Sequence, residues 1–360
     1  MKAAVCREFG KPLSIEHVEI DSPQRGEVKV RIKACAICHS DVHCVRGDWG
    51  YQAPLVAGHE AAGVVTEVGD DVGELRTGDR VVVTLMRSCG CCFQCRRGKS
   101  NLCETGFALD RETRLRSRTG ESIFQGIKTG AFAEYAVVHQ SQLVKMPEGM
   151  PFETASLLAC GVITGVGAVV NTARVETGST VAVIGGGGVG LNCIQGAVLS
   201  GASRIVGIDL RADKLEACRR FGATDTINAA ECDPVENVKQ ITGGVGLDYA
   251  FVAVGSAKAA NQASGMIRPG GTVVIVGMPA NDDVTVTLNA HDLSMDRTIR
   301  GSLMGSTRLA TDVPRLIDLY RNGRLKLDEL ISGRFGLEDI NAALDGTERG
   351  EALRNVILFE

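Results

Sequence analysis

Hydrophobic and polar residues alternate along the first 150 residues as they do in short antiparallel strands. Apolar side chains occupy every second position of segment 28–34, and segments 63–65 and 80–83 are similar short runs between Gly and Asp turns. Such alternation is typical of a strand with one buried face and one face in water. We therefore expect a β-rich first domain.

The pattern changes near residue 156. Segment 155–168 has a helical apolar pattern, and the apolar strand 180–184 leads into a glycine turn and then a helix with an apolar face. Helices separate several of the further apolar strands, which is typical of a doubly wound parallel sheet. These further strands are expected at 204–209, 225–228, 248–254, 272–277 and 298–301.

After residue 305 the pattern returns to a helix at 312–322 and a last strand at 355–359. The predicted fold class is α/β, with a β-rich first domain and a doubly wound Rossmann domain. We assign residues 1–161 with 305–360 to the first and residues 162–304 to the second.

Charge and length limit the possible partners. The chain has 360 residues and a formal net charge of −4, which gives no field that attracts nucleic acid or an anionic membrane. No apolar run reaches the roughly 20 residues that span a bilayer, and no signal peptide is evident. We expect a cytoplasmic protein that binds small molecules and keeps its 13 cysteines reduced.

The glycine turn has the spacing of a dinucleotide site. Gly185 permits the sharp turn, Gly187 lets the backbone approach a pyrophosphate, and Gly190 lets the helix pack on the strand. Asp209 follows Gly190 by 19 residues and is placed to bind the adenosine ribose, which favours NAD over NADP. Lys214, with Arg211, either softens that preference or lies in solvent. The full predicted turn also includes Gly188 and Val189.

Four cysteines have the spacing of a closed metal site. They form a Cys-x2-Cys-x2-Cys-x7-Cys run of 15 residues, namely Cys89, Cys92, Cys95 and Cys103. Four thiolates complete a tetrahedral zinc shell, so this zinc would be structural. Cys91 is next to Cys92 and could compete for the metal, but the regular spacing selects Cys92.

Further motifs carry a family resemblance. The segments Gly58-His59-Glu60-Ala61-Ala62-Gly63, Cys38-His39-Ser40-Asp41 and Leu158-Ala159-Cys160-Gly161-Val162-Ile163-Thr164-Gly165, together with the cysteine run, resemble the zinc-containing medium-chain alcohol dehydrogenase family. The match extends over nearly the whole chain in the same order. It implies a GroES-like catalytic domain and a second, catalytic zinc.

The resemblance also implies the roles of individual residues. Cys38, His59 and Cys160 would hold the catalytic zinc and leave one position open for Lewis-acid catalysis. Glu60 would lie behind the metal, and Asp41 would accept a hydrogen bond from His59. Ser40 and His43 would carry the substrate proton toward solvent. Contacts with NAD are implied for His39, Thr164, Val254, Val276, Met278 and Arg354.

His39 stands where many relatives have an arginine that faces the pyrophosphate. A neutral histidine would hold that phosphate less tightly, which predicts faster release of NADH where release limits turnover.

The substrate is the least determined part of the prediction. Residues 48–51, Leu85 and segment 107–124 would line the pocket by resemblance, and their apolar character favours a medium-chain or aromatic primary alcohol. The alternative is thiol-dependent formaldehyde oxidation, in which the adduct's carboxylate would bind basic side chains, with help from Asp48. The candidates are Arg111, Arg114, Arg116 and Arg118.

Two further points stay open. A zinc-free or non-catalytic relative of the fold is a remote alternative, because every implied ligand is present. Segment 103–132 is longer than in the compact tetrameric members of the family and resembles that of the dimeric members, so the resemblance implies a homodimer, with a tetramer as the alternative.

Overall fold

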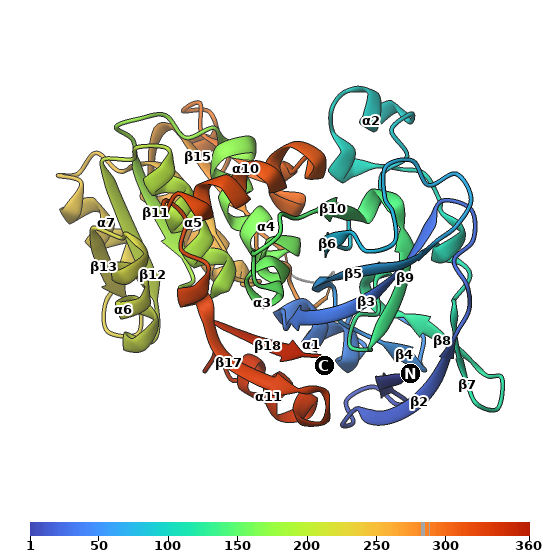
Figure 1. The fold of residues 1–360 in the computed structure, drawn as a ribbon. Coiled ribbons are helices and arrows are strands. Elements are labelled where there is room, and N and C mark those ends of the chain that lie inside the picture. Colours follow the sequence, from blue (N-terminus) through green and yellow to red (C-terminus); the bar gives the residue numbers. More distant parts are fainter. Residues whose placement is uncertain (282–284, 288) are drawn as a thin grey trace. The chain divides into compact units, whose positions relative to one another are not determined.

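The computed structural model describes residues 1–281, 285–287 and 289–360. The chain forms two compact units (Figure 1). Unit 1 comprises Met1–Cys160, Arg308–Gly323 and Leu327–Glu360, and unit 2 comprises Gly161–Thr307 and Arg324–Lys326. The sequence predicted that the chain passes from the first domain to the second after residue 161 and returns to the first after residue 304.

A short return segment, Arg324–Lys326, belongs to unit 2 and is hydrogen-bonded to it. Gln195 pairs with the backbone of Lys326 in both directions, with Nε2 3.0 Å from Lys326 O and Oε1 2.7 Å from Lys326 N. The Gln195 amide thus satisfies the backbone N–H and C=O of Lys326. It attaches segment 324–326 to the helix that contains Gln195.

Unit 1 is built on two β structures around one apolar core. A small barrel contains, in spatial order, β1 (Lys2–Cys6), β2 (Ser14–Ile20), β7 (Leu115–Ser117), β8 (Ser122–Gln125) and β4 (Leu55–Val56). The seven-stranded sheet has the order β10 (Leu143–Lys145), β6 (Arg80–Val83), β5 (Glu60–Val68), β3 (Glu27–Ala36), β18 (Arg354–Leu358) and β17 (Ile331–Gly336), with β9 (Tyr135–His139) also paired to β3.

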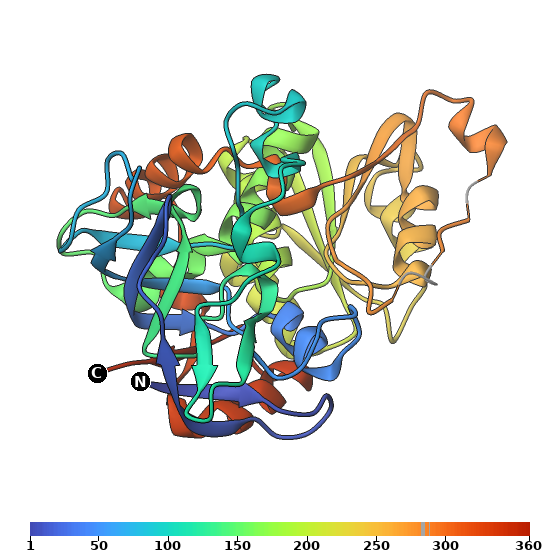
Figure 2. The ribbon, with the colours of Figure 1, turned by 90° about the vertical axis from the view of Figure 1, so that its right-hand side faces the viewer.

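The end of the chain completes the sheet of unit 1. Strand β18, drawn in red, pairs antiparallel with β3, drawn in blue, with Val356 opposite Ala36 (Figure 1). The two termini lie near each other in both views (Figure 2). The helices of this unit are α1 (His39–Arg46), α2 (Phe93–Arg96), α3 (Phe152–Ser156), α10 (Leu309–Arg321) and α11 (Ile340–Glu348).

Unit 2 is a six-stranded sheet in which all neighbouring strands are parallel. The order is β13 (Asp225–Asn228), β12 (Arg204–Asp209), β11 (Thr180–Ile184), β14 (Leu247–Val252), β15 (Ile267–Ile275) and β16 (Thr298–Gly301). The reversal of strand order beside β11 is the feature that places ligands in doubly wound sheets. The helices are α4 (Gly161–Gly167), α5 (Gly188–Leu199), α6 (Ala212–Phe221), α7 (Pro234–Ile241), α8 (Ala257–Met266) and α9 (Ala290–Leu293).

One expected helix is broken. Segment 155–168 contains the end of α3, the 3₁₀ turn η5 (Leu157–Ala159) and α4, and Cys160 separates the last two. The backbone of Cys160 has φ −145° and ψ −69°, which is not helical. Thr84 Oγ1 donates to the Ala159 carbonyl at 2.6 Å, a bond that satisfies a group left open by the break. The prediction of one continuous helix was wrong because the apolar pattern does not show this break.

Candidate metal centres and dinucleotide site

Four buried side chains of unit 1 form a cluster of metal-ligand type: Cys38, His59, Glu60 and Cys160. One donor atom from each lies within 4.8 Å of those of the other three. Cys38 precedes α1, His59 precedes β5, and Cys160 follows η5. Three segments far apart in the sequence therefore meet at one point.

A buried carboxylate connects two of these segments. Asp41 Oδ1 lies 2.9 Å from His59 Nδ1 and accepts the Gly58 N–H at 3.0 Å. Its Oδ2 accepts the Cys38 N–H at 2.9 Å. A carboxylate at Nδ1 keeps the proton of a neutral imidazole on that nitrogen, so Nε2 is the nitrogen with a free lone pair. Asp41 thus fixes the tautomer that a metal ligand requires.

Two side chains of the cluster have polar atoms without a hydrogen-bond partner. His59 Nε2 and both Glu60 carboxylate oxygens are buried without a hydrogen bond to any described residue. The interaction between the two thiols lowers the pKa of Cys38 well below its usual value and raises that of Cys160 well above it. A divalent cation would use the free nitrogen and hold both sulfurs as thiolates, so the donor set fits zinc.

Arg354 faces the same cluster. Its Nη2 lies 3.5 Å from Glu60 Oε1, and the two side chains are only 6% and 0% exposed. Burial raises the pKa of Glu60 to about 8, and the guanidinium opposes this shift. The pyrophosphate contact implied for Arg354 stays a prediction, since the described side chain is directed at Glu60.

The second cluster is the cysteine run, which forms a lobe over residues 89–103. The sulfurs of Cys89, Cys92, Cys95 and Cys103 lie within 4.8 Å of one another, and all four residues are half-buried. Cys92 Sγ and Cys103 Sγ are 3.9 Å apart. In a tetrahedral site with Zn–S bonds of about 2.3 Å, sulfurs are about 3.8 Å apart. Cys91 lies outside the cluster with an exposed side chain.

The thiols of the lobe do not share one preferred charge. The Thr105 hydroxyl and the N–H groups of Cys91 and Cys92 lower the pKa of Cys89 to about 5. Desolvation and the neighbouring sulfur of Cys92 raise that of Cys95 to about 12. Four thiolates this close repel one another unless a cation neutralises them, so this donor set also fits zinc.

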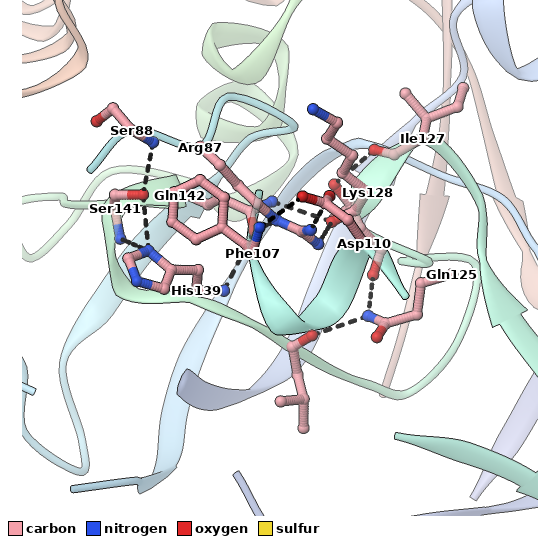
Figure 3. Close-up of polar contacts among 12 residues, drawn as sticks. Arg87, Ser88, Phe107, Asp110, Gln125, Ile127, Lys128, His139, Ser141 and Gln142 are labelled. Carbon is pink, nitrogen blue, oxygen red and sulfur yellow. Dashed lines mark hydrogen bonds and ion pairs between the residues drawn. The ribbon is translucent and has the colours of Figure 1, made fainter. Parts of the chain in front are cut away.

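A buried arginine anchors the base of the lobe (Figure 3). Arg87 Nε donates to Gln142 Oε1 at 2.7 Å, and Nη2 donates to the Lys128 carbonyl at 2.8 Å. Its Nη1 donates to Asp110 Oδ1 at 2.6 Å. Arg87 precedes the lobe and Asp110 follows it, so one side chain holds both stems.

A second group of contacts lies beside this arginine (Figure 3). The Ser88 N–H donates to Ser141 Oγ at 3.0 Å, and that oxygen lies 2.8 Å from His139 Nδ1. The Phe107 ring meets the His139 ring edge-on, with centroids 4.7 Å apart. Burial, followed by the charge of Arg87, lowers the pKa of His139. Phe107 therefore packs at the base of the lobe.

Unit 2 carries the glycine turn after β11. A Cβ on Gly190 would lie 1.7 Å from Gly185 O, so the helix approaches the turn as only glycine allows. A Cβ on Gly187 would meet nothing within 4 Å, which leaves that side of the turn open. Asp209 ends β12, and its Oδ2 accepts the Gly186 N–H at 2.7 Å. The carboxylate and the turn are thus adjacent, as a Rossmann dinucleotide site requires.

Comparison with known families agrees with both units. Residues 24–148 match the model of the alcohol dehydrogenase GroES-like domain, and residues 188–322 match that of the zinc-binding dehydrogenases. The chain belongs to the zinc-type medium-chain alcohol dehydrogenases. The fold class predicted from the sequence, a GroES-like domain with a Rossmann domain, is confirmed.

Full-length relatives support the same assignment. The chain is 36% identical to the NDMA-dependent alcohol dehydrogenase of Amycolatopsis methanolica, covering 99% of this chain and 98% of that one. It is 37% identical to an alcohol dehydrogenase of Malus domestica, covering 100% and 97%. Among solved structures, benzyl alcohol dehydrogenase of Acinetobacter calcoaceticus is similar, with a TM-score of 0.93, 30% identity and coverage of 100% and 99%.

The remaining predicted cofactor contacts of the dehydrogenase differ in exposure. Thr164 is buried, with Oγ1 3.7 Å from Met304 Sδ, and Val276 is buried too. Val254 and Met278 are 36% and 56% exposed. Exposed apolar side chains are available to a ligand, so these two are the better candidates.

Two further cofactor predictions concern helix starts in unit 2. Gly188 and Val189 form the first turn of α5, where free N–H groups favour an anion. Lys214 is buried in α6, and burial lowers the pKa of its amine. Lys214 is therefore not a freely solvated lysine, which was one of the two interpretations of this residue.

The arginine-bearing segment is largely engaged within unit 1. Arg114 is buried and donates to both carboxylate oxygens of Glu27, at 2.8 and 2.7 Å. Arg116 Nε lies 3.5 Å from Asp21 Oδ2. Arg111 and Arg118 are exposed. Arg114 thus has a structural ion pair, and a substrate carboxylate could replace it only by leaving Glu27 buried and unpaired.

Sequence reasoning missed the contacts that support the lobe and one contact of the proposed relay. His43 Nδ1 lies 2.6 Å from Asp48 Oδ2, whereas Asp48 was expected from the sequence only in the pocket lining and as a help for an adduct substrate. Arg87 was not singled out at all. A cation just before a cysteine run and a carboxylate just after it are the only sequence signals for the Arg87 contact.

Among the described residues, no single helix is both long and apolar enough to cross a membrane. One bent pair of helices, Phe152–Ala159 with Gly161–Ala173, is long and apolar enough when the two are taken together, and most of its side chains are buried.

Proposed function

We propose that this dehydrogenase oxidises a primary alcohol, medium-chain or aromatic, with NAD as hydride acceptor and zinc as Lewis acid, and that it also catalyses the reverse reaction. The observation that carries the proposal is the buried set of Cys38, His59 and Cys160, with a free imidazole nitrogen directed at two thiols. Three protein ligands leave one position of a tetrahedral zinc open to an oxygen of the substrate, whose acidity the metal would raise.

The chain's own residues would prepare this site. Asp41 holds His59 in the ligating tautomer. Glu60 belongs to the same buried cluster, with Oε1 3.5 Å from Arg354 Nη2. Burial of the whole cluster excludes water from the reacting oxygen and strengthens the electrostatic interactions there. Ser40 and His43, both on α1, would pass the substrate proton outward.

The preference for NAD rests on Asp209. Its carboxylate ends β12 beside the glycine turn, where it would accept hydrogen bonds from ribose hydroxyls and repel a 2′-phosphate. The name of the Amycolatopsis relative states a dependence on NDMA, so NDMA is the acceptor to compare with NAD.

An aromatic or medium-chain alcohol fits the residues that follow α1. Trp49 and Tyr51 pack against the apolar core of unit 1 along with Leu85. Burial raises the pKa of Tyr51 to about 12, so its hydroxyl stays neutral at any assay pH in ordinary use. The similar structure from Acinetobacter is named as a benzyl alcohol dehydrogenase, which supports the aromatic option.

Thiol-dependent formaldehyde oxidation is the second candidate. It needs a cation for the adduct's carboxylate, and the exposed Arg111 and Arg118 are the arginines of this segment that remain for that purpose. The engagement of Arg114 with Glu27 and of Asp48 with His43 counts against it. A homodimer in the cytoplasm stays our expectation for assembly and location.

The test is an assay of NADH formation by zinc-replete protein with ethanol, hexanol, octanol, benzyl alcohol and cyclohexanol, and with formaldehyde in the presence and absence of glutathione or mycothiol. Parallel reactions replace NAD by NADP or NDMA. Oxidation of free primary alcohols with NAD supports the proposal. Turnover of formaldehyde only with a thiol would replace it by the second candidate.

A further inference from the structure

The ring of His43 is held by a residue that lies beyond the end of its own helix. His43 belongs to the last turn of α1, and its Nδ1 lies 2.6 Å from Asp48 Oδ2. The two side chains are 13% and 28% exposed, so the pair is largely shielded from water. A charge-assisted hydrogen bond this short orients an imidazole as well as pairing charge.

Helical geometry alone would keep these side chains apart. Five residues along an α-helix turn by about 500°, so a continued helix would place positions 43 and 48 some 140° apart. The helix ends instead at Gly47, whose φ of 83° is left-handed. A Cβ there would lie 2.8 Å from the Phe9 ring, so glycine serves both the turn and the packing.

The reversed chain returns Asp48 to the residue that it contacts. The Asp48 N–H donates to the His43 carbonyl at 3.1 Å, and the Asp48 carboxylate reaches the His43 ring. The ring centroid of the next residue, Trp49, lies 5.2 Å from that of the His43 imidazole. The His39 and His43 rings meet edge-on, with centroids 5.0 Å apart. The imidazole is therefore fixed by a carboxylate and by two rings.

We propose that Asp48 is a positioning residue for proton transfer: it keeps the proton of neutral His43 on Nδ1, so that Nε2 is always the nitrogen that accepts the substrate proton. This inference rests on the proposed function, in which His43 carries that proton. A carboxylate at the distal nitrogen also stabilises the imidazolium that forms.

The proton balance of the step is complete. Oxidation of a primary alcohol breaks one C–H and one O–H bond; the hydride goes to the nicotinamide with both electrons, and the remaining proton travels outward from Ser40. Nε2 of His43 takes up that proton, Nδ1 keeps its own, and the Nε2 proton then leaves to solvent. Asp48 orients the ring and exchanges no proton in this step.

The experiment is a double-mutant cycle measured by steady-state NADH formation with the best alcohol of the panel. Asp48→Asn keeps the shape but can donate an amide N–H to Nδ1, which favours the opposite tautomer. We expect kcat to fall about tenfold to a hundredfold, as for other residues that orient a functional histidine, with little change in KM. In the His43→Gln background the same substitution should change kcat less than about twofold.

The controls separate positioning from stability. Asp70→Asn makes the same change at an exposed aspartate of unit 1 and should leave kcat as in the wild type. Melting temperatures should agree among all variants, and Asp48→Glu should restore part of kcat. An equal loss from Asp48→Asn in both backgrounds, or no loss in either, would refute the proposal.

A measurement without turnover distinguishes this inference from the proposed function. Nitrogen NMR of isotope-labelled histidine reports which ring nitrogen carries the proton, and the His43→Gln spectrum identifies the signal among the six histidines. We expect an Nδ1–H form in the wild type and its loss in Asp48→Asn. An Nε2–H form in the wild type would overturn the inference whatever the activity. An inactive wild type with an Nδ1–H signal would overturn only the proposed function.

Discussion

The two metal-type clusters of unit 1 use cysteine in opposite settings. The lobe draws four half-buried sulfurs from 15 consecutive residues, and the protein backbone donates several N–H groups to them. The buried cluster draws Cys38, His59, Glu60 and Cys160 from three distant segments, and its free donors are a nitrogen and a carboxylate. The first set closes a tetrahedron, whereas the second has three expected ligands and would leave the fourth position open.

This difference separates structural from chemical use of a metal. A short loop without an apolar core needs the metal in order to fold, and a full sulfur shell gives that stability. The buried cluster has the core of unit 1 around it and does not need a metal for folding in the same way. Buried polar atoms without hydrogen-bond partners lower the stability of a fold, so their presence here indicates a functional site. The buried cluster is therefore the candidate for catalysis.

The largest expected effect separates the clusters by activity. Cys38→Ser removes one of three ligands of the buried cluster, and we expect alcohol turnover to fall about 1,000-fold or more, since Lewis-acid stabilisation contributes several kcal/mol. NADH binding, measured by fluorescence titration, should remain, because the glycine turn and Asp209 belong to unit 2. The matched control is Cys232→Ser, an exposed cysteine. Full activity of Cys38→Ser would contradict the assignment.

The next prediction concerns the lobe alone. Cys92→Ser should lower the zinc content from two ions per chain to one, measured by elemental analysis. The lobe should become sensitive to limited proteolysis between residues 89 and 103, because so short a loop does not hold its conformation without metal. The buried cluster should keep its metal and its turnover. Loss of both metals would mean that the clusters are not independent.

The third prediction concerns Arg87 at the base of the lobe. Its buried hydrogen bonds should keep the base in its conformation without metal better than the lobe keeps its own. Arg87 has a side chain only 1% exposed and donates to three partners. Arg87→Lys keeps the charge but not the fork, and we expect about 1–3 kcal/mol less stability by urea unfolding. Arg97→Lys, at an exposed arginine of the lobe, is the matched control and should change little. A variant as stable as the wild type would show that the stems are held by other contacts.

The smallest expected effect is on the pH dependence of stability, and it comes from His139 at the base of the lobe. Because the folded-state pKa of His139 lies below the unfolded value of about 6.5, its contribution to stability is present above that pH and falls as pH drops through it. His139→Asn keeps an acceptor for the Ser141 N–H but does not titrate. Between pH 7.5 and pH 5.5, about one unit on either side of the unfolded pKa, the melting temperature should therefore fall less in the variant than in the wild type. An identical loss in both proteins would exclude His139 as a source.

The lobe was predictable from the sequence because its ligands are neighbours along the chain. The glycine turn and Asp209 were predictable for a similar reason, since a strand, a turn and a helix suffice to place them. The grouping of Cys38, His59 and Cys160 was not, because it depends on strand pairing and on the helix break at Cys160. Only the family resemblance brought these three together.

The contacts of Asp48, Arg87 and Arg114 were missed for a different reason. Each depends on how a charged side chain is directed after the backbone has turned, and charge in a loop is usually solvated. Gly47 reverses the chain before Asp48. Arg114 donates to Glu27, which is far from it in the sequence. No period or spacing in the sequence reports such a pairing.

The most direct test of the central claim is to measure zinc content and alcohol-dependent NADH formation in the same samples during removal and return of zinc. The account predicts that activity disappears as the metal of the buried cluster is removed and returns when zinc is restored, while the lobe's metal has no such effect. Undiminished alcohol oxidation in a sample shown to contain no metal would contradict it.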